Sequence, residues 1–207
     1  MATDVVFAAY GTTEENSRWL KEAVDSLRSF ATNLRRVIVI GNAPADLPDD
    51  VAVFRIPSIL YRGSRYDNAV GGLVKAIECG VLADAFLYAP PGAVLTAPAD
   101  LDAYPDYCRR PRIRSIADLV RENKGGAVVT RYKVVLSDTR AALERNGCPA
   151  LELGGRFLTR IDPADLHEVK RIWLQEPHGE FGYDAACLFG NVRMKRTPFD
   201  TVSPEKV

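Results

Sequence analysis

The sequence has little of the chemistry that marks a zinc protein, a disulfide-rich protein or a membrane protein. Its four cysteines include no Cys-x-x-Cys pair, and only two histidines stand beside them, so we expect free thiols and no zinc site. No apolar run approaches the roughly 20 residues that a bilayer-spanning helix needs. The first residues lack the pattern of a signal peptide, and we therefore expect a cytoplasmic protein.

An excess of charge of either sign is also absent. Lys plus Arg and Asp plus Glu each number 27 in 207 residues, so no overall field directs the protein to nucleic acid or to a membrane surface. The hydrophobic content of 47% is ordinary for a globular chain, and the length suits one domain. We predict a single α/β domain over residues 1–196 and a flexible tail over 197–207, where apolar periodicity is missing.

The apolar segments of the N-terminal half predict a mostly parallel sheet flanked by helices, a Rossmann-like arrangement. Residues 5–9 and 37–40 are continuous apolar runs, as expected for strands covered on both faces. An apolar stripe with helical spacing lies between them, from Leu20 to Phe30. Two further strands are expected over 51–56 and 85–88.

A second helix precedes the last of these strands. Val70, Leu73, Val74 and Ile77 form its apolar stripe, Cys79 continues that face as an expected core residue, and Gly80 is an expected cap. In the C-terminal half the patterns predict helices over 116–123 and 137–146, a short strand over 127–129, and a helix that opens at Asp162-Pro163.

This order of elements brings the ends of the first and fourth strands together, at the crevice where open α/β sheets bind ligands. Tyr88 ends the fourth strand, and Tyr10, Gly11 and Thr12 follow the first. Thr12 is a possible cap of the following helix. The same turn has backbone N–H groups that can receive a nucleotide base or a phosphate, and the two interpretations are compatible.

The residues around this crevice resemble the GT-A-type glycosyltransferases, and more narrowly a group of small phage and bacterial proteins related to capsule-polymerising sugar-phosphate transferases. In that group an Arg or Lys shortly before an Asn opens the helix leading to the metal-binding strand, and here the sequence is Arg65-Tyr66-Asp67-Asn68. An acidic cluster follows that strand in the group. This chain has Phe86-Leu87-Tyr88 followed by Ala89-Pro90-Pro91-Gly92.

Two later segments extend the resemblance, which spans roughly residues 4 to 192. Thr139 to Leu143 with Gly147 is similar to the helix before the acceptor-side segment, and Leu188-Phe189-Gly190-Asn191 is similar to the closing aromatic-Gly-Asn signature. A His that is frequent in the group has no counterpart in Leu153-Gly154-Gly155-Arg156-Phe157. The resemblance implies a nucleotide-sugar donor, with Asn191 on the acceptor or phosphate side.

The missing acidic cluster changes the chemistry that the sequence predicts. A carboxylate-held cation usually stabilises the leaving pyrophosphate, and the side chains of Ala89 to Gly92 cannot hold one. We therefore do not expect a manganese or magnesium ion held by an Asp-x-Asp motif. Pro90 and Pro91 also lack N–H groups, which limits a backbone anion site mainly to Gly92 and Ala93.

Basic residues are the alternative to a metal. Arg65 with Asn68 is the donor-side pair, while Arg131 and Lys133 are candidates for phosphate or acceptor binding, since an Arg fork matches phosphate geometry. The arginines and the lysine can also be solvent-facing loop charges. Asp100-Leu101-Asp102 is a literal Asp-x-Asp, but it follows Pro98 beyond the strand end, and we interpret it as a turn or a cap.

Asp184 is the candidate catalytic residue, as a general base that takes the proton of an acceptor hydroxyl. It can also be a helix cap or the partner of an Arg. His178 lies in an expected loop and is either a second choice of base or an exposed histidine.

Arg109, Arg110, Arg112 and Arg114 form the densest basic run. If the acceptor is modified DNA, as for some phage glycosyltransferases, this run would contact phosphates. Two hypotheses thus remain: a glycosyltransferase that works without an Asp-x-Asp metal, and a catalytically silent GT-A-like protein that serves as a binding or assembly module.

Overall fold

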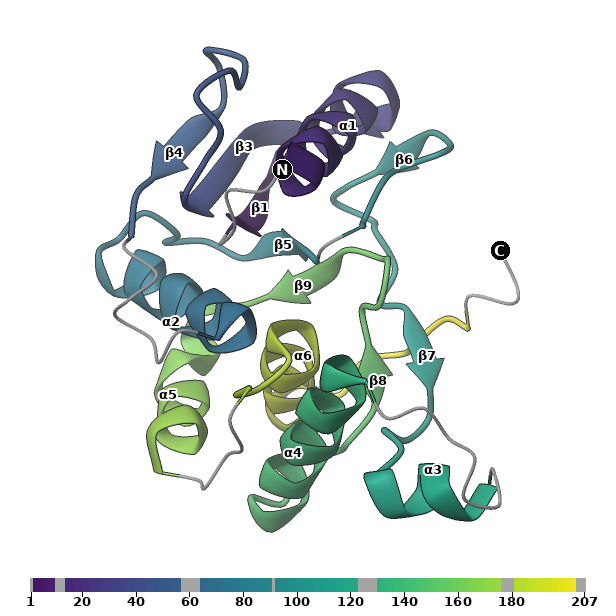
Figure 1. Cartoon of the computed structure of the whole chain (residues 1–207). Coiled ribbons are helices and arrows are strands. Elements are labelled where there is room, and N and C mark those ends of the chain that lie inside the picture. Colours follow the sequence, from purple (N-terminus) through teal and green to yellow (C-terminus); the bar gives the residue numbers. More distant parts are fainter. Residues whose placement is uncertain are drawn as a thin grey trace.

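A five-stranded sheet separates two layers of helices in the computed structural model of the protein, which describes residues 2–9, 14–56, 64–90, 92–122, 130–175 and 181–203 (Figure 1). Its strands, in spatial order, are β4 (Ala52–Phe54), β3 (Leu34–Gly41), β1 (Thr3–Ala9), β5 (Phe86–Ala89) and β9 (Thr159–Ile161). β1, β3, β4 and β5 are parallel, and β9 pairs antiparallel with β5. The predicted α/β architecture with a mostly parallel sheet is confirmed.

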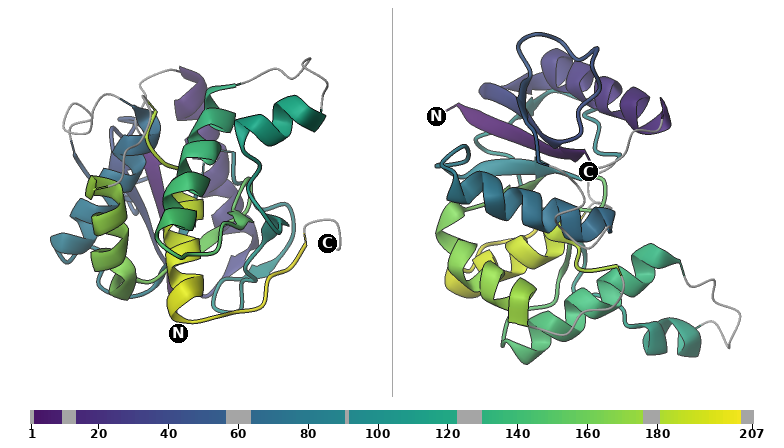
Figure 2. Two further views of the ribbon diagram at one scale, coloured as in Figure 1. Left: turned by 90° about the horizontal axis from the view of Figure 1, so that it is seen from below. Right: turned by 60° about the vertical axis from the view of Figure 1, so that its left-hand side comes forward.

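The two faces of the sheet are covered unequally. Helix α1 (Glu14–Phe30) packs on one face, and the other face carries α2 (Arg65–Glu78), α4 (Arg131–Arg145), α5 (Leu166–Gln175) and α6 (Ala185–Arg196). Figure 2 shows α1 and α2 on opposite sides of the sheet. Helix α3 (Ile116–Glu122) lies outside these layers, next to α4.

Alternation along the strands divides the apolar side chains between two cores. Phe7 of β1 packs with Leu20 and Val24 of α1, whereas Val6 of the same strand packs with Leu73 of α2 and with residues of α6. Because both faces are buried, the strands carry apolar residues at successive positions. This is why their continuous apolar runs predicted the sheet correctly.

The main difference from the predicted elements is α6. All nine residues from Ala185 to Arg193 are buried, so this helix has no polar stripe from which periodicity could reveal it. Helix α4 begins at Arg131, earlier than the predicted start at residue 137, because Thr130 caps it by accepting a hydrogen bond from the Lys133 N–H at 3.4 Å. The predicted strand over 127–129 lies outside the described residues.

Short elements complete the fold. β2 (Ala31–Thr32) pairs with β6 (Ala99–Asp100), β7 (Cys108–Arg110) pairs with β8 (Glu152–Leu153), and the 3-10 helix η2 (Pro163–Asp165) leads into α5. After α6 the chain returns to β7, where Val202 forms a bridge with Tyr107 (Figure 1). The described part of the predicted tail, up to Ser203, therefore contacts the domain.

The four cysteines are free thiols, as predicted. The expectation that Cys79 is a core residue is wrong: it is exposed, because α2 ends at Glu78 and Cys79 is its C-terminal cap. Cys108, Cys148 and Cys187 are buried. In the part of the chain that the structure describes, no helix has the length and apolar character needed to cross a membrane.

At the amino-terminal edge of the sheet, a buried carboxylate joins β1 to β3. Asp4 is 1% exposed and accepts hydrogen bonds from Arg35 Nε and Nη2, both at 2.8 Å, and from Arg36 Nη2 at 2.6 Å. Burial by itself would raise the pKa of Asp4, but the hydrogen bonds and charges of the two arginines outweigh it and lower the pKa. The ionised form is therefore stabilised by folding.

We expect Asp4→Asn to lower the free energy of unfolding by about 2 kcal/mol at pH 7, the usual value of hydrogen bonds to a charged group. Because the pKa is lower in the folded protein than in the unfolded chain, the difference between wild type and variant is complete above about pH 4. This difference in the free energy of unfolding declines as the pH falls through the pKa of Asp4 in the folded protein. Urea unfolding across this pH range measures it.

The matched control is Asp84→Asn, which removes only the exposed pairing with Arg35 at 2.9 Å. Its cost should stay below about 1 kcal/mol. Equal costs for the two variants, or a cost of Asp4→Asn that does not depend on pH, would contradict this account.

Candidate functional site

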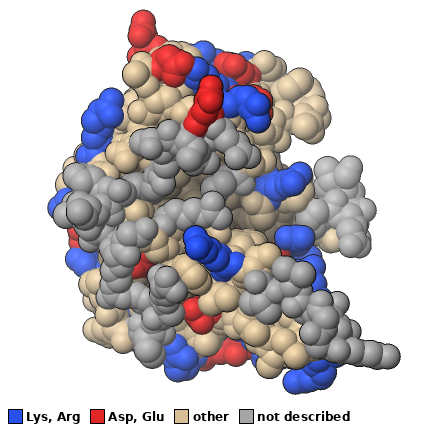
Figure 3. All heavy atoms as spheres, viewed as in Figure 1, with Lys and Arg blue, Asp and Glu red and all other residues tan. Residues whose placement is uncertain are grey.

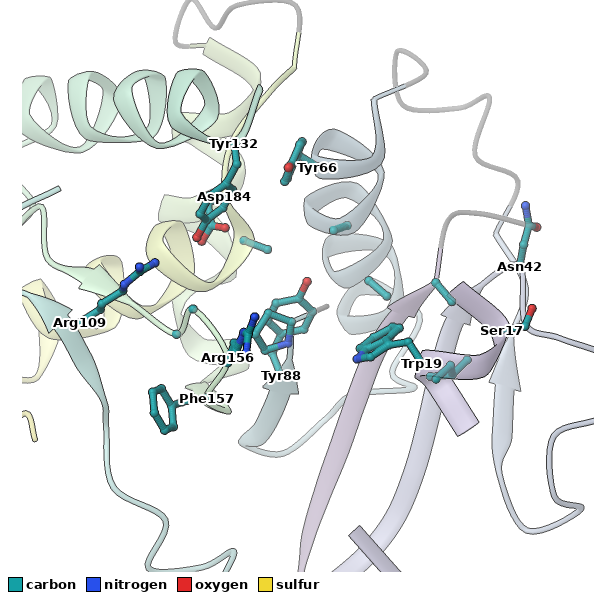
Figure 4. A pocket seen from close by; sticks show the side chains of 18 of the residues that line it. Ser17, Trp19, Asn42, Tyr66, Tyr88, Arg109, Tyr132, Arg156, Phe157 and Asp184 are labelled. Carbon is teal, nitrogen blue, oxygen red and sulfur yellow. The ribbon is translucent and has the colours of Figure 1, made fainter. Parts of the chain in front are cut away.

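A cavity of about 630 Å³ opens at the carboxyl ends of β1 and β5. The strand order reverses between these two strands, which is the place where open α/β sheets bind ligands. The cavity is lined by residues of β1, β5, β7, the four helices α1, α2, α4 and α6, and the segments after β3, β5 and β8 (Figure 4). Its described lining residues are Ala8, Ala9, Ser17, Trp19, Leu20, Asn42, Pro44, Tyr66, Ala69, Tyr88, Pro90, Arg109, Tyr132, Gly154, Gly155, Arg156, Phe157, Asp184 and Ala185.

The two ends of this cavity differ in charge. Near β1 and β3 the described lining consists of Ser17, Trp19, Leu20, Asn42 and Pro44, none of them ionisable; we call this the uncharged end. The opposite side, the charged end, carries Arg109 and Asp184 with Tyr132. Arg156, Tyr88 and Tyr66 lie between the two ends in Figure 4.

The beginnings of four helices meet at the cavity. Ser17 lies in the first turn of α1, Tyr66 and Tyr132 are the second residues of α2 and α4, and Ala185 is the first residue of α6. Each helix beginning carries a partial positive charge from its unpaired N–H groups. Together with Arg109 and Arg156 they favour an anionic ligand.

Asp184 is the acidic side chain of the described lining, and it caps α6. Its carboxylate accepts a hydrogen bond from the Cys187 N–H at 2.8 Å, and its own N–H donates to Thr139 Oγ1 at 2.9 Å. Although the residue is partly open to the cavity, burial of the carboxylate raises the pKa of Asp184, and the charge of Glu152 adds to the effect. A carboxylate with a raised pKa is a stronger base once it is ionised.

Tyr132 lies close to this carboxylate. The negative charge of Asp184 is the main cause that raises the pKa of Tyr132, with burial second. Tyr66 of α2 stacks on Tyr132 of α4, with ring centroids 6.2 Å apart and planes inclined by 27°. The charged end thus has an aromatic wall in which Tyr132 remains a neutral phenol at physiological pH.

Glu152 anchors the arginines behind the charged end. Its side chain is 2% exposed, and its carboxylate lies 3.4 Å from Arg109 Nη1 and 2.9 Å from Arg110 Nη1. Arg110 donates a hydrogen bond to Glu152, whereas the Arg109 side chain is 52% exposed and lines the cavity. The buried acid therefore holds one side of the Arg109 guanidinium through Nη1, and the side chain points toward the cavity (Figure 4).

The loop after β8 forms the cavity wall through two glycines in the left-handed region. Gly154 has φ 75°, and a Cβ atom there would lie 2.8 Å from Ala186 Cβ and 2.9 Å from Thr159 Oγ1. Gly155 has φ 74°, but the nearest atom to its Cβ would be Arg109 Cδ at 3.8 Å. Gly154 is thus required by close packing on α6 as well as by its backbone conformation.

The structure brings Tyr88, Asp184 and Arg109 together among the predicted residues. Tyr10, Gly11 and Thr12 lie outside the described residues, as does His178. Arg65 is the first residue of α2, but its side chain is also outside the described part of the structure. Their assignment to a donor site remains a prediction.

Other predicted residues lie apart from the cavity lining. Asn68 is buried within α2, and Gly92 lies in a turn closed by the Ala93 N–H, which donates to the Pro90 carbonyl at 3.0 Å. Arg131 begins α4, with its guanidinium 5.4 Å from the centre of the Phe181 ring, and Lys133 follows in the same helix.

Asn191 is fully buried, and it joins α6 to the strand before the cavity loop. It accepts a hydrogen bond from the Leu151 N–H at 2.8 Å and donates to the Leu151 carbonyl at 2.9 Å and the Cys187 carbonyl at 2.7 Å. These bonds occupy the side chain within the core. Asn191 therefore has a structural role and does not face the cavity.

The described residues do not fit a metal ion at this cavity. β5 ends in Ala89 and Pro90, and no group of three or more His, Cys, Asp or Glu side chains converges among the residues that the structure describes. Asp100 and Asp102 are structural, as the sequence suggested: they accept hydrogen bonds from Asn33 Nδ2 at 2.8 Å and Thr3 Oγ1 at 2.6 Å, at the opposite end of β1.

The basic run is largely paired within the protein. Arg110 pairs with Glu152 and Arg112 with Glu144, the latter at 2.7 Å, and Arg114 also has an interaction. On the face seen in Figure 3, the described Lys and Arg side chains are interspersed with Asp and Glu. Arg109 differs from its neighbours because it faces the cavity.

Several lining residues were not candidates from the sequence: Trp19, Tyr66, Tyr132, Arg156 and Phe157. Trp19 and Tyr66 lie within the first two turns of helices whose beginnings were predicted to face the crevice, and this position is a signal that could have identified them. For Arg156 and Phe157 the signal is the Gly-Gly pair before them, which is typical of a special backbone conformation. Comparison with protein-family models found no match, and neither did comparison with curated proteins.

The two glycines of the cavity wall give a matched pair of variants. We expect Gly155→Ala to cost about 1 kcal/mol for the left-handed conformation alone. Gly154→Ala should cost about 1–3 kcal/mol more, because the same conformation is combined with overpacking against Ala186 and Thr159. Chemical denaturation of both variants measures the difference, and equal costs would show that α6 can move away from the loop.

Proposed function

We propose that this protein has a GT-A-like fold and is a glycosyltransferase that binds a nucleotide-activated sugar in the cavity. The observation that carries the proposal is the asymmetry of the cavity at the strand reversal. The uncharged end with Trp19 suits a planar, neutral nucleoside. Arg156 lies between the two ends of the cavity, whose lining includes four helix beginnings, and this combination suits a diphosphate.

In the proposed reaction, an acceptor hydroxyl attacks the anomeric carbon of the donor sugar. Asp184 takes the hydroxyl proton, a new carbon–oxygen bond forms, and the bond from the anomeric carbon to the diphosphate oxygen breaks. The leaving nucleoside diphosphate gains negative charge, which Arg156 and the helix beginnings stabilise. Since the described donor set does not fit a cation, no step in this scheme uses a metal.

The second candidate function is binding without turnover, in a silent GT-A-like protein used for binding or assembly. Pro90 favours it, because it lines the cavity at the strand end where the resembling enzymes have acidic residues. Donor binding is common to both functions. The hydrolysis or transfer of the donor separates them.

We expect thermal unfolding to shift upward with at least one member of a panel of nucleotide sugars. At about 100 times the dissociation constant, a ligand adds roughly 2.7 kcal/mol, equivalent to about 5–10 °C for a chain of this length. The shift should persist in a chelator and should shrink in Trp19→Ala. Absence of a shift with every donor, with and without manganese, would contradict a donor site.

We expect Asp184→Asn to lower the transfer rate by a factor of about 10²–10⁴, the range for loss of a general base. Donor affinity should change little. Asn is as good a helix cap as Asp, so the variant should fold, and the control Asp162→Asn changes another cap, outside the cavity lining. A general base must be ionised, and burial raises the pKa of Asp184. As the pH is lowered, wild-type turnover should therefore begin to fall at a pH above the range in which an ordinary carboxyl group is protonated. Full activity of Asp184→Asn would remove Asp184 from the mechanism.

A further inference from the structure

Arg109 lies at the far side of the cavity from the uncharged end. It comes from β7, and Figure 4 shows its guanidinium pointing into the cavity beyond Asp184 as seen from Trp19. Arg109 is also among the charges that act on Tyr132, together with Asp184 and Glu152. These four side chains are therefore neighbours at the charged end.

The fixed position of Arg109 is unusual among the basic residues of this segment. Arg110 and Arg112 point their charges at Glu152 and Glu144. Arg109 pairs with Glu152 at 3.4 Å through Nη1, but its side chain remains 52% exposed and lines the cavity. A guanidinium anchored on one side by a buried acid, with its other side open, can receive an anionic group bidentately.

The reaction geometry assigns this place to the acceptor rather than to the donor. A general base must lie within hydrogen-bond reach of the hydroxyl that it deprotonates, so the acceptor hydroxyl lies at Asp184. The rest of the acceptor then extends beside Tyr132, which lines the same end of the cavity as Asp184, and toward Arg109 (Figure 4). The stacked Tyr66 and Tyr132 rings give an aromatic wall, and the C–H face of a sugar ring can pack against an aromatic ring.

We propose that the charged end is an acceptor subsite for an anionic saccharide, whose ring packs on Tyr66 and Tyr132 and whose phosphate or carboxylate group binds Arg109. This inference rests on the proposed function for the identity of the reacting hydroxyl. The binding of the saccharide itself depends only on the residues of the charged end.

The test measures the binding of four probes by calorimetry: glucose, glucose 6-phosphate, glucuronate and inorganic phosphate. Glucose 6-phosphate, glucuronate or both should bind at least about tenfold more tightly than glucose, as expected for a hydrogen-bonded ion pair. The two acidic sugars distinguish a phosphate from a carboxylate as the anionic group. Inorganic phosphate should bind more weakly than the acidic sugar, because it lacks the ring.

The matched variants are Arg109→Gln and Arg110→Gln. Both remove a partner of Glu152, but only Arg109 lines the cavity. Arg109→Gln should abolish the preference for the acidic sugar over glucose, and Arg110→Gln should keep it. Tyr132→Leu should weaken glucose and the acidic sugars by the same factor, since it removes the wall and not the charge.

Equal affinity for glucose and for both acidic sugars, or an unchanged preference in Arg109→Gln, would overturn the proposal. It would also be overturned if inorganic phosphate bound as tightly as the acidic sugars, or if a short DNA duplex bound more tightly and lost its binding in Arg109→Gln. Nucleotide-sugar binding is measured separately. If a nucleotide sugar binds and neither acidic sugar binds, the subsite alone is refuted. If an acidic sugar binds and no nucleotide sugar binds, the proposed function alone is refuted.

Discussion

The close packing of α6 against the segment from Leu151 to Gly155 is the constraint on which the cavity depends. At Gly190 a Cβ atom would lie 2.5 Å from Leu153 Cδ1, and at Gly154 it would lie 2.8 Å from Ala186 Cβ. Asn191 closes the contact through two hydrogen bonds to the backbone of Leu151, and a third bond to the Cys187 carbonyl holds its amide against α6. Two glycines, Gly154 and Gly190, and the buried amide of Asn191 therefore set the position of α6. They also set the position of Asp184 at the beginning of this helix.

The sheet and the place of the cavity could be predicted from the sequence, because both follow from local patterns. Continuous apolar runs indicated strands buried on both faces, and the parallel order then placed a crevice at the reversal between β1 and β5. The helix α6 could not be found in this way. Its residues from Ala185 to Arg193 are all buried, so no exposed polar stripe reveals its 3.6-residue period. The Gly190-Asn191 pair, which resembles a family signature, serves packing here.

The composition of the cavity depends on contacts between residues far apart in the chain. Tyr88 could be selected from the sequence because it ends a recognisable strand, and Asp184 because it lies close to the segment that resembles the closing signature. The sequence placed Arg109 in a basic run that would contact phosphates if the acceptor were modified DNA. The structure distinguishes it from Arg110 and Arg112 because Arg109 lines the cavity, although it shares Glu152 with Arg110. Such pairing depends on β7 meeting β8, which local periodicity does not specify.

The charges of the cavity also bear on how a site without acidic ligands would operate under the proposed function. Arginines and helix beginnings are present before the ligand arrives, so their electrostatic stabilisation needs no metal binding step. Asp184 already has a raised pKa through burial and the nearby charge of Glu152. A bound diphosphate would add negative charge close to it and raise the pKa further. Donor binding would thus strengthen the base at the moment when the acceptor proton has to be removed, whereas loss of the nucleoside diphosphate would weaken it again.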